Sequence, residues 1–87
     1  MIYRVKVDVF LKDGVSDPEG FTIAEAAQSL EIAPIIRVRS GKSFLIELDI
    51  SSQEEALAAA ERLGRELLSN PVIEDFVVAE SVEVDHG

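Results

Sequence analysis

The sequence contains no cysteine, and its single histidine, His86, is the last residue but one. The absence of cysteine excludes disulfides, thiol chemistry and thiolate metal sites. Nucleophilic catalysis requires a serine, threonine or cysteine next to a base, and a histidine at the end of a chain is most simply a mobile tail group. These absences indicate a binding or structural module rather than a self-sufficient enzyme.

Basic residues are also scarce, because 8 lysines and arginines stand against 17 acidic residues and the formal net charge is −9. Such a surface repels phosphate backbones and anionic lipids, which disfavours nucleic acids and membranes as partners. Apolar runs are only a few residues long, too short to cross a bilayer. The first residues alternate and carry charge, unlike a signal peptide. We therefore expect a cytoplasmic protein that binds neither nucleic acid nor membrane.

Apart from these scarce residue types, the composition is that of a single globular domain over residues 1–87, with 47% hydrophobic and 29% charged residues. A chain of this length buries only about 60–65% of the surface that its unfolded form exposes, so its own core is marginal. Oligomerisation is a usual remedy for a core of this size.

Alternating apolar and polar residues predict a strand at residues 2–11, with one buried face and one exposed face. Residues 35–39 and 44–50 also read as strands. The glycine-containing connection Ser40-Gly41-Lys42 predicts that these two strands form an antiparallel hairpin.

A last strand is expected over residues 73–84, which is longer than a typical strand. One face carries Phe76, Val78, Val82 and Val84 and is interrupted only by Glu80. A long apolar strand at a sheet edge is an aggregation hazard unless something pairs with it or covers it. We therefore expect self-association through the sheet edges or the open sheet face.

Helical spacing predicts two helices. Asp17 is suited to cap the first helix, and Pro18 is suited to its first position, where a missing N–H costs nothing. This helix should end near residues 31–32. The second helix should start after the serines at 51–52, which a glutamate follows three residues later, and should end at Asn70-Pro71.

The resulting order is βαββαβ, which predicts an α+β protein with a ferredoxin-like fold: an antiparallel sheet with two helices on one face. In that arrangement the last strand lies at a sheet edge.

Few residues suggest chemistry. Arg39 and Lys42 with the amides of Ser40-Gly41 make one local basic cluster, which reads either as an anion site or as a hairpin turn with a solubilising lysine. The acidic pairs at 54–55 and 74–75 could bind a divalent cation. Helix-start electrostatics explains the first pair more simply, and a solvated turn before the last strand explains the second.

Three segments together resemble the PurS family. Residues 11–20, LKDGVSDPEG, resemble the family's LKxGVxDPxG stretch; residues 38–42, VRSGK, resemble its VRxGK segment; residues 67–76, LLSNPVIEDF, resemble its LLxNPVIEDY segment. Their order and spacing also agree. Phe76 stands where tyrosine is common, and Ser40 replaces a usual valine.

The resemblance implies a subunit of formylglycinamide ribonucleotide amidotransferase in purine biosynthesis. The complete enzyme converts formylglycinamide ribonucleotide, ATP and glutamine to formylglycinamidine ribonucleotide, ADP, phosphate and glutamate. A glutaminase subunit (PurQ) releases ammonia and a synthetase subunit (PurL) uses ATP and Mg²⁺. The resemblance implies that this chain binds no cofactor, has no catalytic residue, bridges the two subunits for ammonia transfer, and forms homodimers and, in some cases, tetramers.

The resemblance also suggests roles for individual residues. The partner-facing residues would be Arg39, Gly41 and Lys42, with Lys12, Glu74 and Asp75 presented beside them. The structural residues would be Asp17, Pro18, Gly20, Asn70 and Pro71. The alternative is a regulatory amino-acid-binding domain of the ACT type, which shares the βαββαβ order and binds its ligand at a dimer interface near the loop after its first strand.

Overall fold

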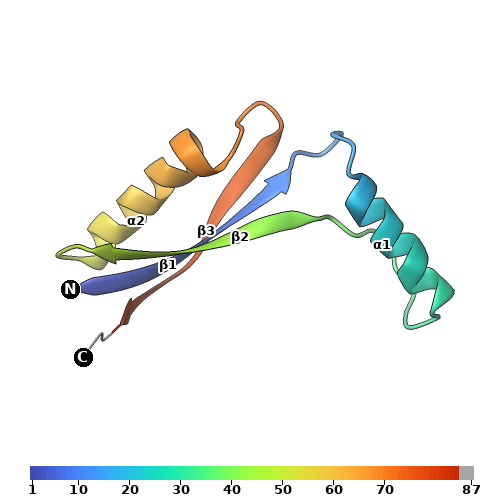
Figure 1. Cartoon of the computed structure of the whole chain (residues 1–87), viewed down its shortest axis with the longest axis horizontal. Helices are drawn as coiled ribbons and strands as arrows, with labels where there is room; N and C mark the ends of the chain where they lie inside the picture. The colour runs from blue at the N-terminus through green and yellow to red at the C-terminus, as the bar shows by residue number, and fades with distance from the viewer. Residues whose placement is uncertain (85–87) are drawn as a thin grey trace.

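The computed structural model describes residues 1–84, which form three strands, two α-helices and one π-helical turn (Figure 1). In chain order the elements are β1 Ile2–Leu11, α1 Pro18–Ser29, β2 Gly41–Asp49, α2 Gln53–Leu63, η1 Gly64–Leu68 and β3 Glu74–Val84. His86, predicted to be a mobile tail group, lies outside the described residues.

The three strands form one antiparallel sheet in the order β2-β1-β3. The alternation in β1 works as predicted, because Tyr3, Val5, Val7 and Val9 all point to the buried face. The prediction of an α+β protein with an antiparallel sheet and two helices is therefore confirmed.

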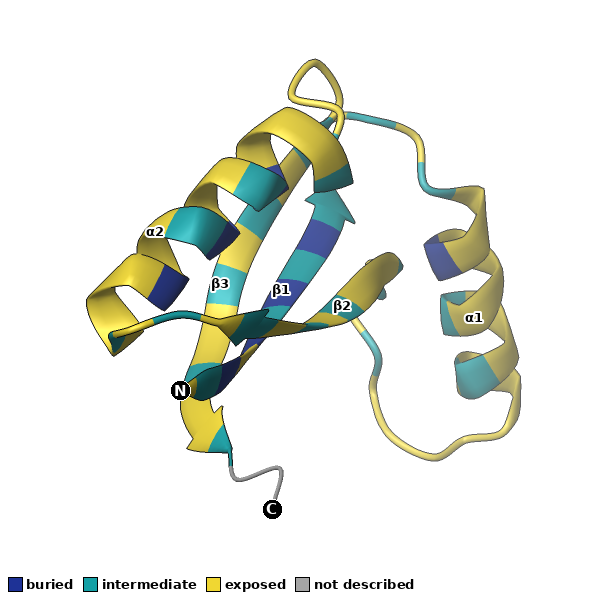
Figure 2. Ribbon diagram, turned by 60° about the vertical axis from the view of Figure 1, so that its left-hand side comes forward, coloured by how far each residue is buried: buried dark blue, intermediate teal, exposed yellow. Residues whose placement is uncertain are grey.

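One helix covers the buried face. α2 and η1 pack over β1 and β3, and the small side chains of Ala56 and Ala60 are fully buried against β1 (Figure 2). Alanine lets the helix approach the valines of β1 closely. The core is consequently thin, since its fully enclosed side chains are alanines and valines.

The predicted strand at 35–39 is wrong for the single chain. These residues are extended, but they pair with no strand among residues 1–84, and β2 starts only at Gly41. The predicted hairpin turn does not form, and the backbone N–H of Ser40 donates instead to the Asp17 carboxylate. The chain therefore runs on into β2 instead of reversing.

The prediction that both helices cover one face of the sheet is also wrong. α1 lies beyond the end of the sheet, on the opposite side of the molecule from α2 (Figure 1). The molecule measures 49 × 31 × 14 Å as a result. The apolar face of α1 is left largely uncovered, with Phe21 66% and Leu30 69% exposed.

The predicted apolar face of β3 is divided by a β-bulge. Val78 pairs with Val7 but Glu80 pairs with Lys6, so Ala79 is an extra residue and the alternation inverts there. Phe76 and Val78 consequently pack towards α2, whereas Val82, opposite Arg4, faces the other side of the sheet.

The C-terminal end of α2 widens into the π-helical turn η1, and Gly64 in this turn packs against Phe76. The backbone N–H and the hydroxyl of Ser69 both donate to the Gly64 carbonyl oxygen, which closes the turn. A Cβ atom on Gly64 would lie closer than 3.0 Å to three carbons of the Phe76 ring.

Gly64→Val is expected to lower the free energy of unfolding by about 2 kcal/mol. Overpacking costs about 1–3 kcal/mol, which exceeds the roughly 0.4 kcal/mol that valine gains over glycine in helix propensity. Urea denaturation measures the change. The control is Ala58→Val on the exposed face of α2, which should cost only about 0.6 kcal/mol. Equal stability of Gly64→Val and the native protein would contradict this packing.

Candidate functional site: a charged cluster and a hinged arm

Charged side chains from three separate segments meet where β1 ends and β2 and β3 begin. The sheet register produces this meeting, because Phe10 near the end of β1 lies between Gly41 of β2 and Asp75 of β3. We call these residues the end cluster: Lys12, Arg39, Lys42, Glu74 and Asp75. They are the charged residues for which the sequence suggested partner contacts, and the fold brings them together.

The two lysines of the end cluster face carboxylates. Lys12 Nζ lies 2.5 Å from Asp75 Oδ1, and Lys42 Nζ lies 4.0 Å from Glu74 Oε2. Exposed pairs of this kind contribute only about 0–1 kcal/mol to stability. Their main effect is on charge, since the basic cluster expected from Arg39 and Lys42 is largely neutralised.

Arg39 is held by several local contacts. Its guanidinium donates a hydrogen bond to the Leu11 carbonyl oxygen at 2.6 Å and lies 5.7 Å from the centre of the Phe10 ring. The Asp13 carboxylate is 4.0 Å away and also accepts from Arg37. Arg39 therefore anchors the chain that enters β2, while the Lys42 side chain, 59% exposed, is the more accessible cation.

The turn before β3 positions the acidic residues of the end cluster. The Asn70 side chain accepts from the N–H of Val72, and the Asn70 carbonyl accepts from the N–H groups of Ile73 and Glu74. The Glu74 carboxylate accepts from the N–H of Asn70 in return. Pro71 lies inside this turn, so Asn70 and Pro71 fix the direction in which Glu74 and Asp75 point.

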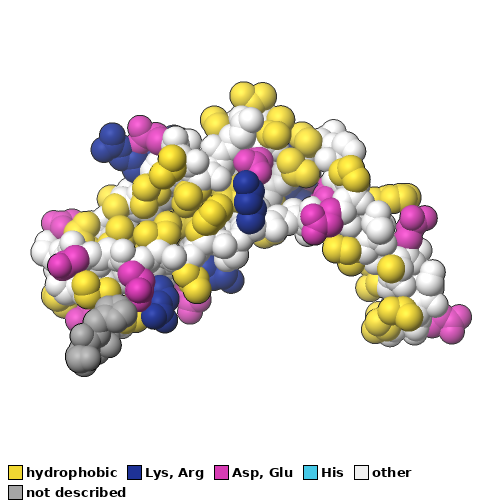
Figure 3. Space-filling view, in the orientation of Figure 1, with side chains coloured by type: hydrophobic (Ala, Val, Ile, Leu, Met, Phe, Trp, Pro, Cys, Tyr) yellow, Lys and Arg dark blue, Asp and Glu magenta, His cyan; other side chains and the backbone are white. Residues whose placement is uncertain are grey.

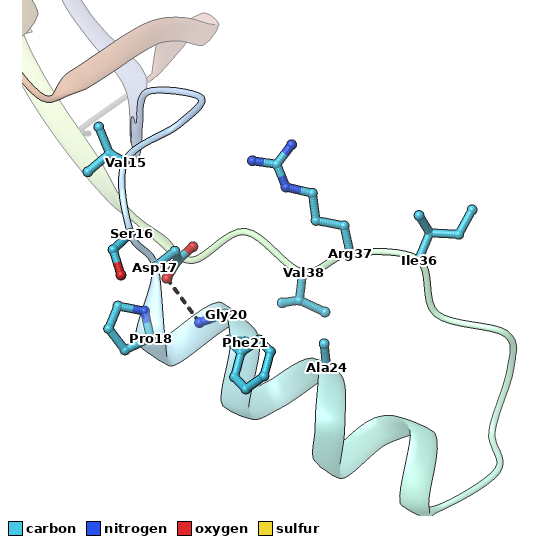
Figure 4. A pocket seen from close by; sticks show the side chains of 10 residues that line it. All are labelled: Val15, Ser16, Asp17, Pro18, Gly20, Phe21, Ala24, Ile36, Arg37 and Val38. Atoms are coloured by element: carbon cyan, nitrogen blue, oxygen red, sulfur yellow. Dashed lines mark hydrogen bonds between the residues drawn. The ribbon is translucent and has the colours of Figure 1, made fainter.

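A second feature is the joint between α1 and β2. The Asp17 carboxylate caps α1 by accepting from the N–H of Gly20 at 2.9 Å, and Pro18 follows as the first helical residue (Figure 4). The Asp17 carboxylate also accepts from the N–H of Ser40 at 2.7 Å and from the Ser40 hydroxyl at 2.5 Å. The hydrogen bonds from Ser40 are the main reason that the pKa of Asp17 lies below its ordinary value of 3.8.

Sequence reasoning identified the cap but missed the bond to Ser40, which is 23 residues away. The one available signal was the serine itself, because it stands where the resembled family usually has valine. A hydroxyl at that position can donate to a carboxylate, and valine cannot.

The joint makes one unit of residues 17–40, which we call the arm. Gly20 touches the backbone at Val38, where a Cβ atom would lie closer than 3.0 Å to the carbonyl oxygen. Between α1 and the returning segment is an open cavity of about 600 Å³, lined in part by Phe21, Ala24 and Val38 (Figure 4). Beside it the Ile36 side chain is 99% exposed. The arm thus presents an apolar surface.

The acidic pairs behave as local structure suggests. Glu55 donates its N–H to the Ser52 hydroxyl at the start of α2 and accepts from the Ser51 hydroxyl, and Glu74 and Asp75 face lysines. Within residues 1–84, no group of three or more metal-ligating side chains is found. No helix in that range is long and apolar enough to cross a membrane.

The fold and site define a class: a small, open α+β protein with charged and apolar surfaces suited to contact with other chains. Comparison with known proteins specifies the family. The family model for PurS, phosphoribosylformylglycinamidine (FGAM) synthase, matches residues 4–81. Among curated relatives, the Thermotoga maritima synthase subunit PurS is 32% identical over 91% of this chain and 96% of its own length. The Bacillus subtilis PurS subunit is 35% identical over 86% of this chain and 88% of its own.

Solved structures agree with the sequence relatives. Thermus thermophilus PurS superposes with a TM-score of 0.90 at 29% identity, covering 98% of this chain and 100% of that one. A chain in the structure of PurLQS from Thermotoga maritima gives a TM-score of 0.79 at 30% identity, covering 97% and 99% of the two chains. The chain belongs to the PurS family of FGAM synthase subunits.

Asp17→Asn is expected to lower stability at neutral pH and to make the Ser40 amide exchange faster with solvent. Because the folded-state pKa of Asp17 lies below 3.8, the stabilisation by its carboxylate is complete above that pH and is lost as the pH falls through the folded-state value. Unfolding free energies of the two proteins should therefore converge in acid. Asp49→Asn, at the exposed end of β2, controls for the change in net charge. A stability difference that persists undiminished in strong acid would contradict the role of the charge.

Proposed function

We propose that this chain is the subunit that joins the synthetase subunit PurL to the glutaminase subunit PurQ in FGAM synthase. The enzyme would convert formylglycinamide ribonucleotide, ATP and glutamine to formylglycinamidine ribonucleotide, ADP, phosphate and glutamate. The observation that carries the proposal is the likeness, over nearly the full length of both chains, to a chain of the PurLQS structure.

The chemistry gives a reason for a joining subunit. Ammonia in water at neutral pH is mostly protonated and is then no longer a nucleophile. A glutaminase that releases ammonia must therefore be held close to the synthetase that consumes it, with the transfer shielded from water. Such a role needs contact surfaces rather than acids and bases. The end cluster and the arm offer surfaces of two kinds, one charged and one apolar.

The end cluster is the proposed contact with a partner subunit. Four of its charges already form ion pairs within the chain, so few side chains need to be ordered when a partner binds. Matched charges of this kind favour the correct partner and orientation more than raw affinity. Gly41 contributes backbone only, and Lys42 is the exposed cation.

ATP and Mg²⁺ are assigned to the synthetase subunit, and this chain is proposed to bind no cofactor. The carboxylates of Glu74 and Asp75 support this assignment, because they offset the charge of the two lysines of the end cluster that would otherwise attract a triphosphate. We further propose that the complex is cytoplasmic and that the chain acts as a homodimer or a tetramer, which its large exposed surface supports.

Reconstitution tests the proposal. Synthetase and glutaminase subunits from the same source are mixed with and without this chain, and both glutamine-dependent amidine formation and co-elution on gel filtration are measured. The three-subunit mixture should form a complex and be active with glutamine, whereas the two-subunit mixture should not. Identical activity and elution in both mixtures would overturn the proposed function.

The double variant Arg39→Ala, Lys42→Ala is expected to weaken binding to the partner subunits at least tenfold. It removes the two cations of the end cluster that lie beside the start of β2. The matched control is Arg62→Ala with Arg65→Ala, which removes two exposed cations from the C-terminal end of the α2–η1 helix. Titration of the partner subunits measures affinity, and circular dichroism checks the fold. Equal affinity in both double variants would remove the end cluster from the interface, and loss of folding would assign Arg39 and Lys42 a structural role.

A further inference from the structure

An exposed apolar knob stands beside the end cluster. We use this name for Leu67 of η1 and for Pro71, Val72 and Ile73 in the turn before β3. Apart from the arm, Val72 at 79% and Leu67 at 73% are the most exposed large hydrophobic residues within residues 1–84. Figure 3 shows apolar side chains gathered over this turn at the upper edge of the molecule. Apolar side chains that gather in one exposed place mark a contact surface, whereas single ones need no explanation.

The π-helical turn exposes Leu67. By α-helical spacing Leu67 follows Gly64 by three residues, and both would lie on the face that packs on the sheet. The Gly64 carbonyl oxygen instead accepts from the N–H of Ser69, five residues further on. In this wider turn Leu68 packs against the core and Leu67 is left in solvent. π-Helical turns of this kind are frequent at functional sites.

The turn before β3 presents Val72 in a fixed position. The Asn70 side chain accepts from the N–H of Val72, and the carbonyl oxygen of Ile73 accepts from the N–H of Lys12 at 2.8 Å. These bonds use the backbone of Val72 and not its side chain. The apolar side chain therefore has no role in the turn, and a partner that contacts it has little chain to order.

The knob and the end cluster form one continuous surface. Lys12 of the end cluster donates its N–H to Ile73 of the knob, and the Glu74 carboxylate accepts from the N–H of Asn70 beside it. The surface thus has an apolar part next to a charged part, which is the usual arrangement of an interface with an apolar centre and a polar rim. In such interfaces a few buried anchors supply most of the affinity, and charges at the rim act mainly on encounter and orientation.

The shape of the knob restricts the kind of partner. The turn that carries the knob projects from the molecule, at the top of the view in Figure 1. A projecting surface buries its side chains only in a concave one, because interface cores are packed as closely as protein interiors. Two copies related by a two-fold axis at the knob would oppose one projection to another and leave both in water. A concave pocket on a different subunit satisfies the knob.

We propose that the knob is the apolar anchor of the end-cluster interface. Leu67 and Val72 insert into a concave apolar pocket on the enzyme subunit that the end cluster contacts, and the charges of the end cluster lie at the rim of that pocket. This inference rests on the proposed function and specifies which side chains hold the partner. It also assigns the affinity mainly to the knob rather than to the ion pairs.

The double variant Leu67→Ala, Val72→Ala tests the anchor. In titrations of the purified synthetase and glutaminase subunits, it should bind at least about tenfold more weakly than the native chain to the subunit whose affinity the Arg39→Ala, Lys42→Ala variant also lowers. Its loss should be the same at about 0.1 M and about 1 M salt, whereas the loss in the charge variant should shrink, because salt screens exposed charges and not apolar contacts. Circular dichroism should show an unchanged fold, since both side chains are exposed.

The matched control is Leu45→Ala with Val77→Ala. It removes the same two kinds of side chain, 69% and 54% exposed, from the open face of the sheet, where Leu45 pairs with Lys6 and Val77 with Asp8. This control should bind like the native chain. Native affinity in the knob variant, or an equal loss in both variants, would overturn the anchor. A changed oligomeric state of the knob variant in light scattering would assign the knob to a contact between copies and would overturn it too.

The reconstitution assay separates the two proposals. If the knob variant assembles with native affinity and the complex still requires this chain, the anchor is wrong and the proposed function stands. If the native chain binds neither enzyme subunit, the proposed function fails and the anchor fails with it.

Discussion

The bond between the Asp17 carboxylate and Ser40 fixes the direction in which the chain enters β2, and the rest of the structure depends on that direction. With Ser40 held, the chain cannot reverse into a hairpin. The sheet therefore has three strands within residues 1–84, and α1 lies beyond its end. The joint at Asp17 and the open shape of the molecule therefore occur together.

An open structure gives a small protein extensive surface at the expense of core. The buried apolar residues are few and mostly small: Tyr3, Val5, Val7, Val9, Ala56 and Ala60. Such a core leaves little stability to spare. Contacts with other chains can supply the remainder, and this couples the folding of the chain to its assembly. The proposed joining role uses surface that a closed fold would have buried.

Much of the fold could be predicted from local patterns. The alternation of β1 and the caps of both helices depend on neighbouring residues, so a single sequence reveals them. That residues 35–39 do not pair with β2 could not be predicted, because the next residue, Ser40, is bound by Asp17, more than twenty residues away. Helical spacing likewise says that α1 has an apolar face but not which sheet it covers.

Two smaller differences between the predicted and the observed structure coincide with unusual residues in the sequence. Glu80 interrupted an otherwise apolar face, and the β-bulge lies next to it. Ser40 replaced a usual valine, and it makes the distinctive bond to Asp17. The gathering of Lys12 with Asp75 and of Lys42 with Glu74 follows from the sheet register, which the patterns of β1 and β3 predicted only in part.

The central claim is that this chain couples the two active sites of FGAM synthase. The most direct measurement is the ratio of glutamate released to formylglycinamidine ribonucleotide formed by the synthetase and glutaminase subunits. With this chain present the ratio should be close to one, because the ammonia released is consumed before it is protonated. Without the chain, glutamine hydrolysis should stop or should exceed product formation. A ratio close to one at an undiminished rate in the absence of the chain would contradict the account.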